Sequence, residues 1–236
     1  MPEMDWDSPE IFFPKTPCYA LRNFGGPMPI LYDSIAAVLH RPGFEGPQQL
    51  RGYIPCNLVG GGSANYYGGP NPERYDPMGI SGVTVGTGVD LGQTDADTLR
   101  SMDVPATLIA AFLPYLGRRQ NDAVRALHSA PLTIGAEDAD RLDAAMLGHH
   151  IEKISRRYDR DAGSGAFAEL PWQAQAVIVS IQYQRGVNSP YKYPNTWAAL
   201  VRRDWADAAR RLGTGHFWSG YRQRRALEGE LLRELR

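Results

Sequence analysis

The sequence predicts an α+β fold, with a small antiparallel sheet near its start and a mainly helical remainder. The segment from about 50 to 92 is rich in glycines and alternating β-branched residues, which is typical of strands. From Thr94 to about 235, apolar residues recur instead at helical spacing. The 236 residues are 43% hydrophobic, which suffices for one sizeable core. We therefore expect one domain over 32–236.

The N-terminal segment 1–31 contains six prolines and no helical period. Because proline breaks helices, we expect an extended arm. We expect this arm to pack against the domain. The alternatives are that it serves as a delivery tag or binds a partner. The chain has two cysteines, Cys18 and Cys56, which fit either one bridge that pins this arm or two free thiols.

Composition argues against several classes of function. The net charge of −1 provides no global field that would attract nucleic acid. No run of about eighteen apolar residues is present, so no membrane span is expected. The first residues, MPEMDWDSPEIFF, are acidic and lack the apolar region of a secretory signal. We therefore expect synthesis in the cytoplasm without a signal peptide.

The first helix should begin at Asp33 or Ser34, either of which can cap it, and end near Pro42. A strand over Arg51–Cys56 is expected next. The following segment, 57–80, reads NLVGGGSANYYGGPNPERYDPMGI. A loop of this length without structure of its own is uncommon and often functional.

The stretch SGVTVGTGVDLGQ predicts one strand over Val83–Leu91. Thr84, Gly86, Gly88 and Asp90 would then share one face, because side chains alternate along a strand. Glycine inside a strand often marks the close approach of a ligand, so this face predicts the floor of a cleft. A strand thinned for helix packing, with Asp90 as a turn residue, is the alternative. The glycine spacing, G-x-G-x-x-x-G, does not fit a dinucleotide-binding loop.

The part after this strand should be helical. Thr94 and Asp97 have the spacing of a capping box, and Pro105 suits the first turn of a helix through Phe112. The other expected helices are 120–129, 136–158, a buried one opened by Pro171, two capped by Asn195 and Asp204, and Tyr221–Leu235.

Two carboxylates are suited to glycoside cleavage, which needs one protonated and one ionised group. Asp90 can supply the ionised group. Glu45 follows the end of a helix, where the negative end of the dipole favours the protonated form. Alone, a glutamate beside glycine is more often a solvated turn residue.

No metal or cofactor is expected. The chain has five histidines, and their one cluster is His149-His150-x-Glu152. Zinc sites on helices favour ligands four positions apart on one face, so a helix surface explains this cluster better.

Taken together, Glu45-Gly46 and Thr84-Val85-Gly86-Thr87-Gly88 followed by Asp90 resemble the phage-type lysozymes of the lysozyme-like superfamily. The resemblance is closest to the muramidase domain of pesticin-like bacterial toxins. In the helical part, three segments resemble the family's central helix, its next helical hairpin and its closing helix, namely 172–186, 195–212 and 221–232. The resemblance spans about 33–235 and implies a lysozyme-like fold.

Two departures from the family pattern are visible. Gln184-Arg185-Gly186 stands where the family usually has Asn-x-Gly, so Gln184 is the expected cleft contact there. By contrast, Arg224, Arg225 and Glu228 match the Arg-Arg-x-x-Glu pattern of the family's closing helix, and their helical spacing favours a structural ion pair. The second departure concerns the second carboxylate. The ordinary phage enzymes carry their aspartate before the threonine, which makes Asp76 a rival of Asp90.

The resemblance implies a peptidoglycan hydrolase that cleaves the β-1,4 bond between N-acetylmuramic acid and N-acetylglucosamine. Glu45 would be the general acid, and Asp90 the base for a water positioned by Thr84. That arrangement predicts inversion and carboxyl groups about 6.5–9.5 Å apart. The substrate-binding residues would be Gly86, Gly88, Tyr66, Tyr67 and Gln184, and Tyr75 is a further tyrosine that could stack on sugars or pin its loop.

A lytic transglycosylase and a non-catalytic wall-binding module are the alternative functions. The substrate lies outside the cytoplasm, so the protein would act in the periplasm or on the wall after delivery or release. A toxin effector, a bacteriocin and a phage lysin all fit. The expected partners are glycan strands, and also a periplasmic immunity protein and a secretion-system or phage component.

Overall fold

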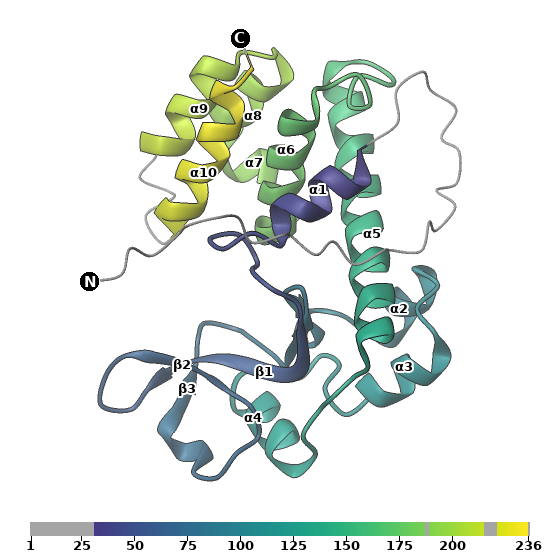
Figure 1. Cartoon of the computed structure of the whole chain (residues 1–236), viewed down its shortest axis with the longest axis vertical. Helices are drawn as coiled ribbons and strands as arrows, with labels where there is room; N and C mark the ends of the chain where they lie inside the picture. Colours follow the sequence, from purple (N-terminus) through teal and green to yellow (C-terminus); the bar gives the residue numbers. More distant parts are fainter. Residues whose placement is uncertain (1–30, 187–188, 215–220, 236) are drawn as a thin grey trace, which may run out of the picture.

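The computed structural model describes residues 31–186, 189–214 and 221–235, so nearly all of the predicted arm, with Cys18, lies outside the described residues. The described chain forms a sheet-containing lobe and a helical lobe, and the long helix α5 (Ala136–Ala162) runs through both (Figure 1). This is the α+β arrangement that the sequence predicts.

The sheet has five antiparallel strands in the order β2-β1-β4-β5, with β3 also paired to β1. The strands are β1 (Gln49–Leu58), β2 (Ser63–Tyr66), β3 (Tyr75–Pro77), β4 (Thr84–Gly86) and β5 (Val89–Asp90). The prediction of an unstructured loop over 57–80 is therefore wrong. Near Cys56, segment 57–80 folds back twice onto β1. Its strand β2 pairs with one edge of β1, and its strand β3 pairs with the other edge.

The glycine-rich stretch forms a hairpin and not the single strand that its alternation predicts. Gly86 and Gly88 have φ of 63° and 76°, a left-handed conformation that reverses the chain around Thr87. Thr84 is nevertheless paired directly with Asp90 across the hairpin. Residues opposite each other in an antiparallel pair share a face, so these two still lie on one side.

The predicted helices are present, with corrections at their starts. Residue Asp95, not Thr94, caps α2 by accepting from the Thr98 N–H, and α1 starts at Tyr32 without a side-chain cap. Asp204 caps α9 as expected, accepting from the Asp207 N–H at 3.0 Å. The bounds are α1 (Tyr32–Leu39), α2 (Ala96–Ser101), α3 (Ala106–Phe112), α4 (Gln120–Ser129), α6 (Trp172–Arg185), α7 (Ser189–Lys192), α8 (Pro194–Val201), α9 (Trp205–Thr214) and α10 (Arg222–Arg233), with short 3-10 turns η1 (Pro72–Arg74) and η2 (Leu91–Gln93).

Each lobe has its own apolar core. The helical core surrounds α6, whose Val177 and Val179 are fully buried, in agreement with its prediction as a central buried helix. The sheet core contains Val83, Val85 and Leu91. Helix α5 contributes to both, because its N-terminal half packs in the sheet core and its predicted stripe of Leu147, Ile151, Ile154 and Tyr158 packs in the helical core.

Cys56 lies in the sheet core, and its thiol donates to the Ile54 carbonyl at 3.3 Å. Burial raises the pKa of this thiol to about 11, which disfavours the reactive thiolate. Across the ranges that the structure describes, no helix is both long and apolar enough to cross a membrane.

Candidate active site

Glu45 sits in a tight turn where the chain leaves α1. Its N–H donates to the Leu39 carbonyl at 3.0 Å, which folds the turn back onto the helix end. Gly43 and Gly46 on either side have φ of 91° and 81°, which few other residues adopt. The turn presents the Glu45 side chain toward the junction of the two lobes.

Arg224 of α10 holds the Glu45 carboxylate. Its Nη1 lies 2.5 Å from Glu45 Oε1, and the two side chains are only 5% and 18% exposed. The Ser180 hydroxyl and carbonyl accept from the same guanidinium at 2.9–3.1 Å. The sequence predicts Arg224 only as part of a pair within its own helix. In the structure, the guanidinium of Arg224 places a fixed positive charge against Glu45. The sequence indicated only the negative end of the helix dipole at this position.

A buried network continues behind Arg224. The carboxylate of Glu228 is fully buried, accepts from the Ser180 hydroxyl at 2.6 Å and lies 2.9 Å from Arg225 Nη2. Burial raises the pKa of Glu228, and the two arginines oppose that rise. Arg225 also donates to Gln184 Oε1 at 2.7 Å. The predicted helical ion pair is therefore present, and it anchors Gln184 as well as the residue that holds Glu45.

Three side chains form a row across the sheet on the face opposite its core. Tyr53 of β1 pairs with Thr84 of β4, which pairs with Asp90 of β5. Burial raises the pKa of the Tyr53 phenol to about 12, and the negative charges of Glu45 and Asp90 contribute. Both carboxylates thus lie within electrostatic range of one phenol. The sequence did not single out Tyr53, which the structure shows alternating along β1 with the buried Gly52 and Ile54.

Asp90 is also bonded to the backbone at its own strand end. Its Oδ1 accepts from Gly92 N–H at 2.8 Å and from Gly82 N–H at 3.1 Å, while Oδ2 accepts from Gly82 N–H at 3.3 Å, and the Gln93 side chain also donates to this carboxylate. Burial raises its pKa, and these hydrogen bonds and Arg119 oppose the rise. Asp90 is therefore a turn residue whose carboxylate is held by backbone and side-chain donors.

The two glycines of the hairpin make room for carboxylates of the protein itself. A Cβ on Gly88 would lie 2.7 Å from Glu45 Oε2, and one on Gly86 would collide with the carboxylate of Asp143. The sequence predicts that a ligand lies against these glycines. The structure instead places Glu45 and Asp143 there.

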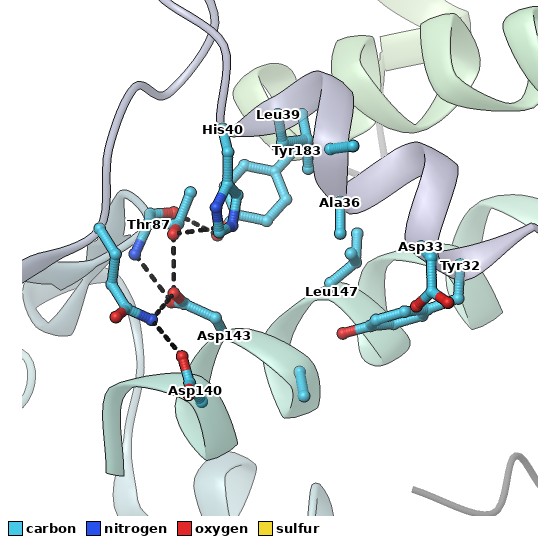
Figure 2. Close-up of a pocket in the computed structure, with 13 residues that line it drawn as sticks. Tyr32, Asp33, Ala36, Leu39, His40, Thr87, Asp140, Asp143, Leu147 and Tyr183 are labelled. Carbon is cyan, nitrogen blue, oxygen red and sulfur yellow. Dashed lines mark hydrogen bonds between the residues drawn. The ribbon is translucent and has the colours of Figure 1, made fainter. Parts of the chain in front are cut away.

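Asp143 of α5 clamps the hairpin turn (Figure 2). Its two oxygens accept from the N–H and the hydroxyl of Thr87, each at 2.7 Å, and Gln48 Nε2 donates to it at 2.8 Å. The Tyr183 hydroxyl donates to the Thr87 carbonyl at 2.7 Å. Burial raises the pKa of Asp143, and the hydrogen bonds from Thr87 and Gln48 oppose that rise. The turn that touches Glu45 is therefore tied to both α5 and α6.

His40 extends this clamp to the end of α1. Its Nε2 lies 3.2 Å from the Thr87 hydroxyl, which already gives its proton to Asp143. Nε2 must therefore carry the proton and donate. A pocket of about 350 Å³ lies beside these residues, between α1 and α5 (Figure 2).

Most of the described chain matches one known protein family. Residues 39–206 match the pesticin family, described as "Bacterial toxin homologue of phage lysozyme, C-term". The chain belongs to the pesticin family. The match covers well over half of the 236 residues and includes Glu45, Thr84 and Asp90. It ends before α10, so Arg224 lies beyond it. A search of curated proteins finds no match.

The tyrosines of this pesticin-family chain divide into two groups. Tyr66 is 1% exposed, donates to the Gly69 carbonyl at 2.9 Å and packs against Tyr75. Its burial leaves no ring face for a sugar, so the expected substrate-binding role is withdrawn. Tyr67 points to the other face, where its ring lies 6.0 Å from that of Tyr53 and 5.3 Å beneath the Arg51 guanidinium.

The rival carboxylate Asp76 lies away from the row. It is exposed on β3 and pairs with Asn57, four residues along β1 from Tyr53. At about 3.3 Å per residue this is a displacement of about 13 Å.

No group of three or more His, Cys, Asp or Glu in the described ranges has a geometry that could hold a metal ion. His150 is instead packed against the ring of Tyr183 at 4.6 Å.

Proposed function

We propose that this chain hydrolyses peptidoglycan at the β-1,4 bond between N-acetylmuramic acid and N-acetylglucosamine. Family membership supports a lysozyme-like toxin. The observation that carries the proposal is the placement of Glu45, held by Arg224, against the hairpin that bears Thr84 and Asp90. Glycoside hydrolysis needs two carboxylates on opposite sides of the bond.

Glu45 would act as general acid through Oε2. Arg224 binds Oε1, whereas Oε2 faces Gly88 and the hairpin. As general acid, Glu45 would donate a proton from this oxygen to the oxygen of the leaving sugar. The guanidinium would then stabilise the carboxylate that remains after the proton has passed to the leaving oxygen.

Asp90 would act as base through Oδ2, with Thr84 orienting the attacking water. Attack by that water from the face opposite Glu45 inverts the anomeric centre. The hydrogen bond to Oδ2, at 3.3 Å, is longer than those to Oδ1, which is why we assign this oxygen to the water. Asp90 and Thr84 are direct partners in the hairpin, whereas Asp76 lies on a separate strand, and we therefore assign Asp90.

A lytic transglycosylase is the second candidate. It uses one glutamate and no base, and the backbone bonds of Asp90 Oδ1 favour it because they give this residue a structural task. The products distinguish the two, since a hydrolase leaves free reducing ends and a transglycosylase leaves 1,6-anhydro ends.

Digestion of purified peptidoglycan by Asp90→Asn and Asp76→Asn tests the assignment of the base. We expect Asp90→Asn to lose about 10²–10⁴-fold in rate, as for other acid–base residues, and Asp76→Asn to keep wild-type activity. Loss of activity in Asp76→Asn alone, with both variants folded, would transfer the role to Asp76.

Such a toxin acts on cell wall outside the cytoplasm. We infer that it reaches the periplasm through a secretion or release system and that the producing cell protects itself with an immunity protein that fills the cleft. Protection by co-expression of a neighbouring gene product that binds the wild type would support this inference.

A further inference from the structure

A second concave surface lies on the sheet lobe, between β1 and the tyrosine-containing segment 57–80. It is a pocket of about 350 Å³. The lining residues used below are Arg51, Asn65, Tyr67, Asn71, Arg74 and Tyr75. We call it the β-lobe pocket.

The β-lobe pocket is cationic. Arg51 and Arg74 line it, and no aspartate or glutamate does. Neither guanidinium forms an ion pair with a carboxylate within the described ranges, whereas Arg100, Arg125 and many other surface arginines of the same ranges do. Two guanidinium groups without a counter-charge attract an anionic ligand, and arginine binds carboxylates through paired hydrogen bonds.

The pocket lies next to the outward face of β1 that carries Tyr53. Arg51 precedes Tyr53 by two residues on the outward face of β1, a separation of about 7 Å. The Tyr67 ring lies between them, 5.3 Å from the Arg51 guanidinium carbon and 6.0 Å from the Tyr53 ring. Asn65 supports Tyr67 through a 3.4 Å contact with its hydroxyl. An aromatic and cationic band therefore leads from the row of Thr84 and Asp90 into the pocket.

We propose that the β-lobe pocket binds carboxylate groups of the peptide stem attached to muramic acid. This inference rests on the proposed function, because it concerns the same substrate. A stem of four residues reaches up to about 14 Å, enough to extend from a sugar over Tyr53 past Arg51, about 7 Å away, into the pocket that Arg74 also lines. The side-chain amides of Asn65 and Asn71 can hydrogen-bond the peptide groups of the stem.

The test compares two soluble substrates, uncrosslinked glycan strands that carry stems and the same strands after an amidase has removed them. The double variant Arg51→Gln, Arg74→Gln should raise KM about tenfold or more on stem-bearing strands, with kcat within about twofold. On stripped strands its KM should equal that of wild type. Arg210→Gln, an exposed arginine of the helical lobe, is the matched control and should change neither.

An equal KM for the double variant and wild type on stem-bearing strands would overturn the inference, as would an equal rise on both substrates. A direct measurement separates this outcome from failure of the proposed function. Calorimetric titration with the free tetrapeptide stem should show binding to wild type and to Glu45→Gln, and none to the double variant. If the wild type binds the stem but cleaves neither substrate, the proposed hydrolysis is contradicted and the pocket assignment stands. If the wild type does not bind the stem, the pocket assignment is contradicted.

Discussion

At the scale of single residues, the contact of Glu45 with Arg224 governs the candidate site. The two residues are 179 positions apart, so no local pattern connects them. The local signal, a glutamate after a helix end with glycines beside it, predicts Glu45 correctly as a turn residue. The charge that faces it comes from tertiary packing of α10, which a sequence pattern for one helix does not contain.

Arg224→Gln should lower both stability and activity. It removes the cation between Glu45 and Glu228 and leaves two carboxylates, one fully buried, with reduced compensation. Breaking such a buried pair costs about 3–5 kcal/mol. Urea denaturation of Arg224→Gln beside Arg125→Gln, an exposed ion pair worth less than about 1 kcal/mol, measures the difference. Equal stabilities would show that the network does not hold Glu45.

At the scale of secondary-structure elements, the hairpin of β4 and β5 is the part that sequence alternation predicts wrongly. Its residues alternate as in one strand, yet the glycine conformations reverse the chain after Gly86. The pairing of Thr84 with Asp90 preserves the predicted shared face for a different reason. Alternation reports which residues share a side, and it does not report where a strand ends.

The clamp on this hairpin predicts a positioning effect. Thr87→Val removes the hydroxyl that Asp143 and His40 share but keeps the side-chain shape. We expect a loss of about 1–3 kcal/mol of stability and a lower kcat with KM nearly unchanged, because the turn beside Glu45 loses its anchor. Thr87→Ser keeps the hydroxyl and should restore kcat. If Val and Ser variants have the same kcat, the clamp has no positioning role.

His150 on α5 predicts a pH effect on stability. Burial, with the nearby His149 and Lys153, lowers its pKa from 6.5 to about 4, and its ring packs on Tyr183. Between these values the unfolded chain binds more protons, so stability is lost as pH falls, by up to about 3 kcal/mol. Denaturation at pH 7, 5 and 4 should show that this loss is absent in His150→Gln. A wild type and variant with parallel pH profiles would contradict the prediction.

The carboxyls of Asp90, Asp143 and Glu228, the first two partly buried and the third fully buried, change stability with pH in the opposite direction. Burial raises the pKa of each, so the folded chain binds more protons and their term favours folding as pH falls. The difference between wild type and His150→Gln isolates the histidine from this background.

At the scale of the whole molecule, two cores joined by α5 define the arrangement. Most helices from Pro105 onward follow from their apolar period, because they bury one stripe, and the stripe of α5 is predicted correctly. Helix α6 is instead buried almost all round, as its continuous apolar run predicts. The strands β2 and β3 are not predicted, because a short strand with polar and glycine neighbours depends on the partner edge that β1 offers. The β-lobe pocket cannot be predicted from the sequence for the same reason, because its residues come together only when β2 and β3 pair with β1.

The measurement that tests the account most directly is digestion of purified peptidoglycan by wild type and Glu45→Gln, with the products analysed by mass spectrometry. We predict free reducing ends at muramic acid for wild type, and a rate about 10²–10⁴-fold lower for a Glu45→Gln variant that remains folded. Glu45→Gln activity equal to wild type, or 1,6-anhydro products from the wild type, would contradict the account.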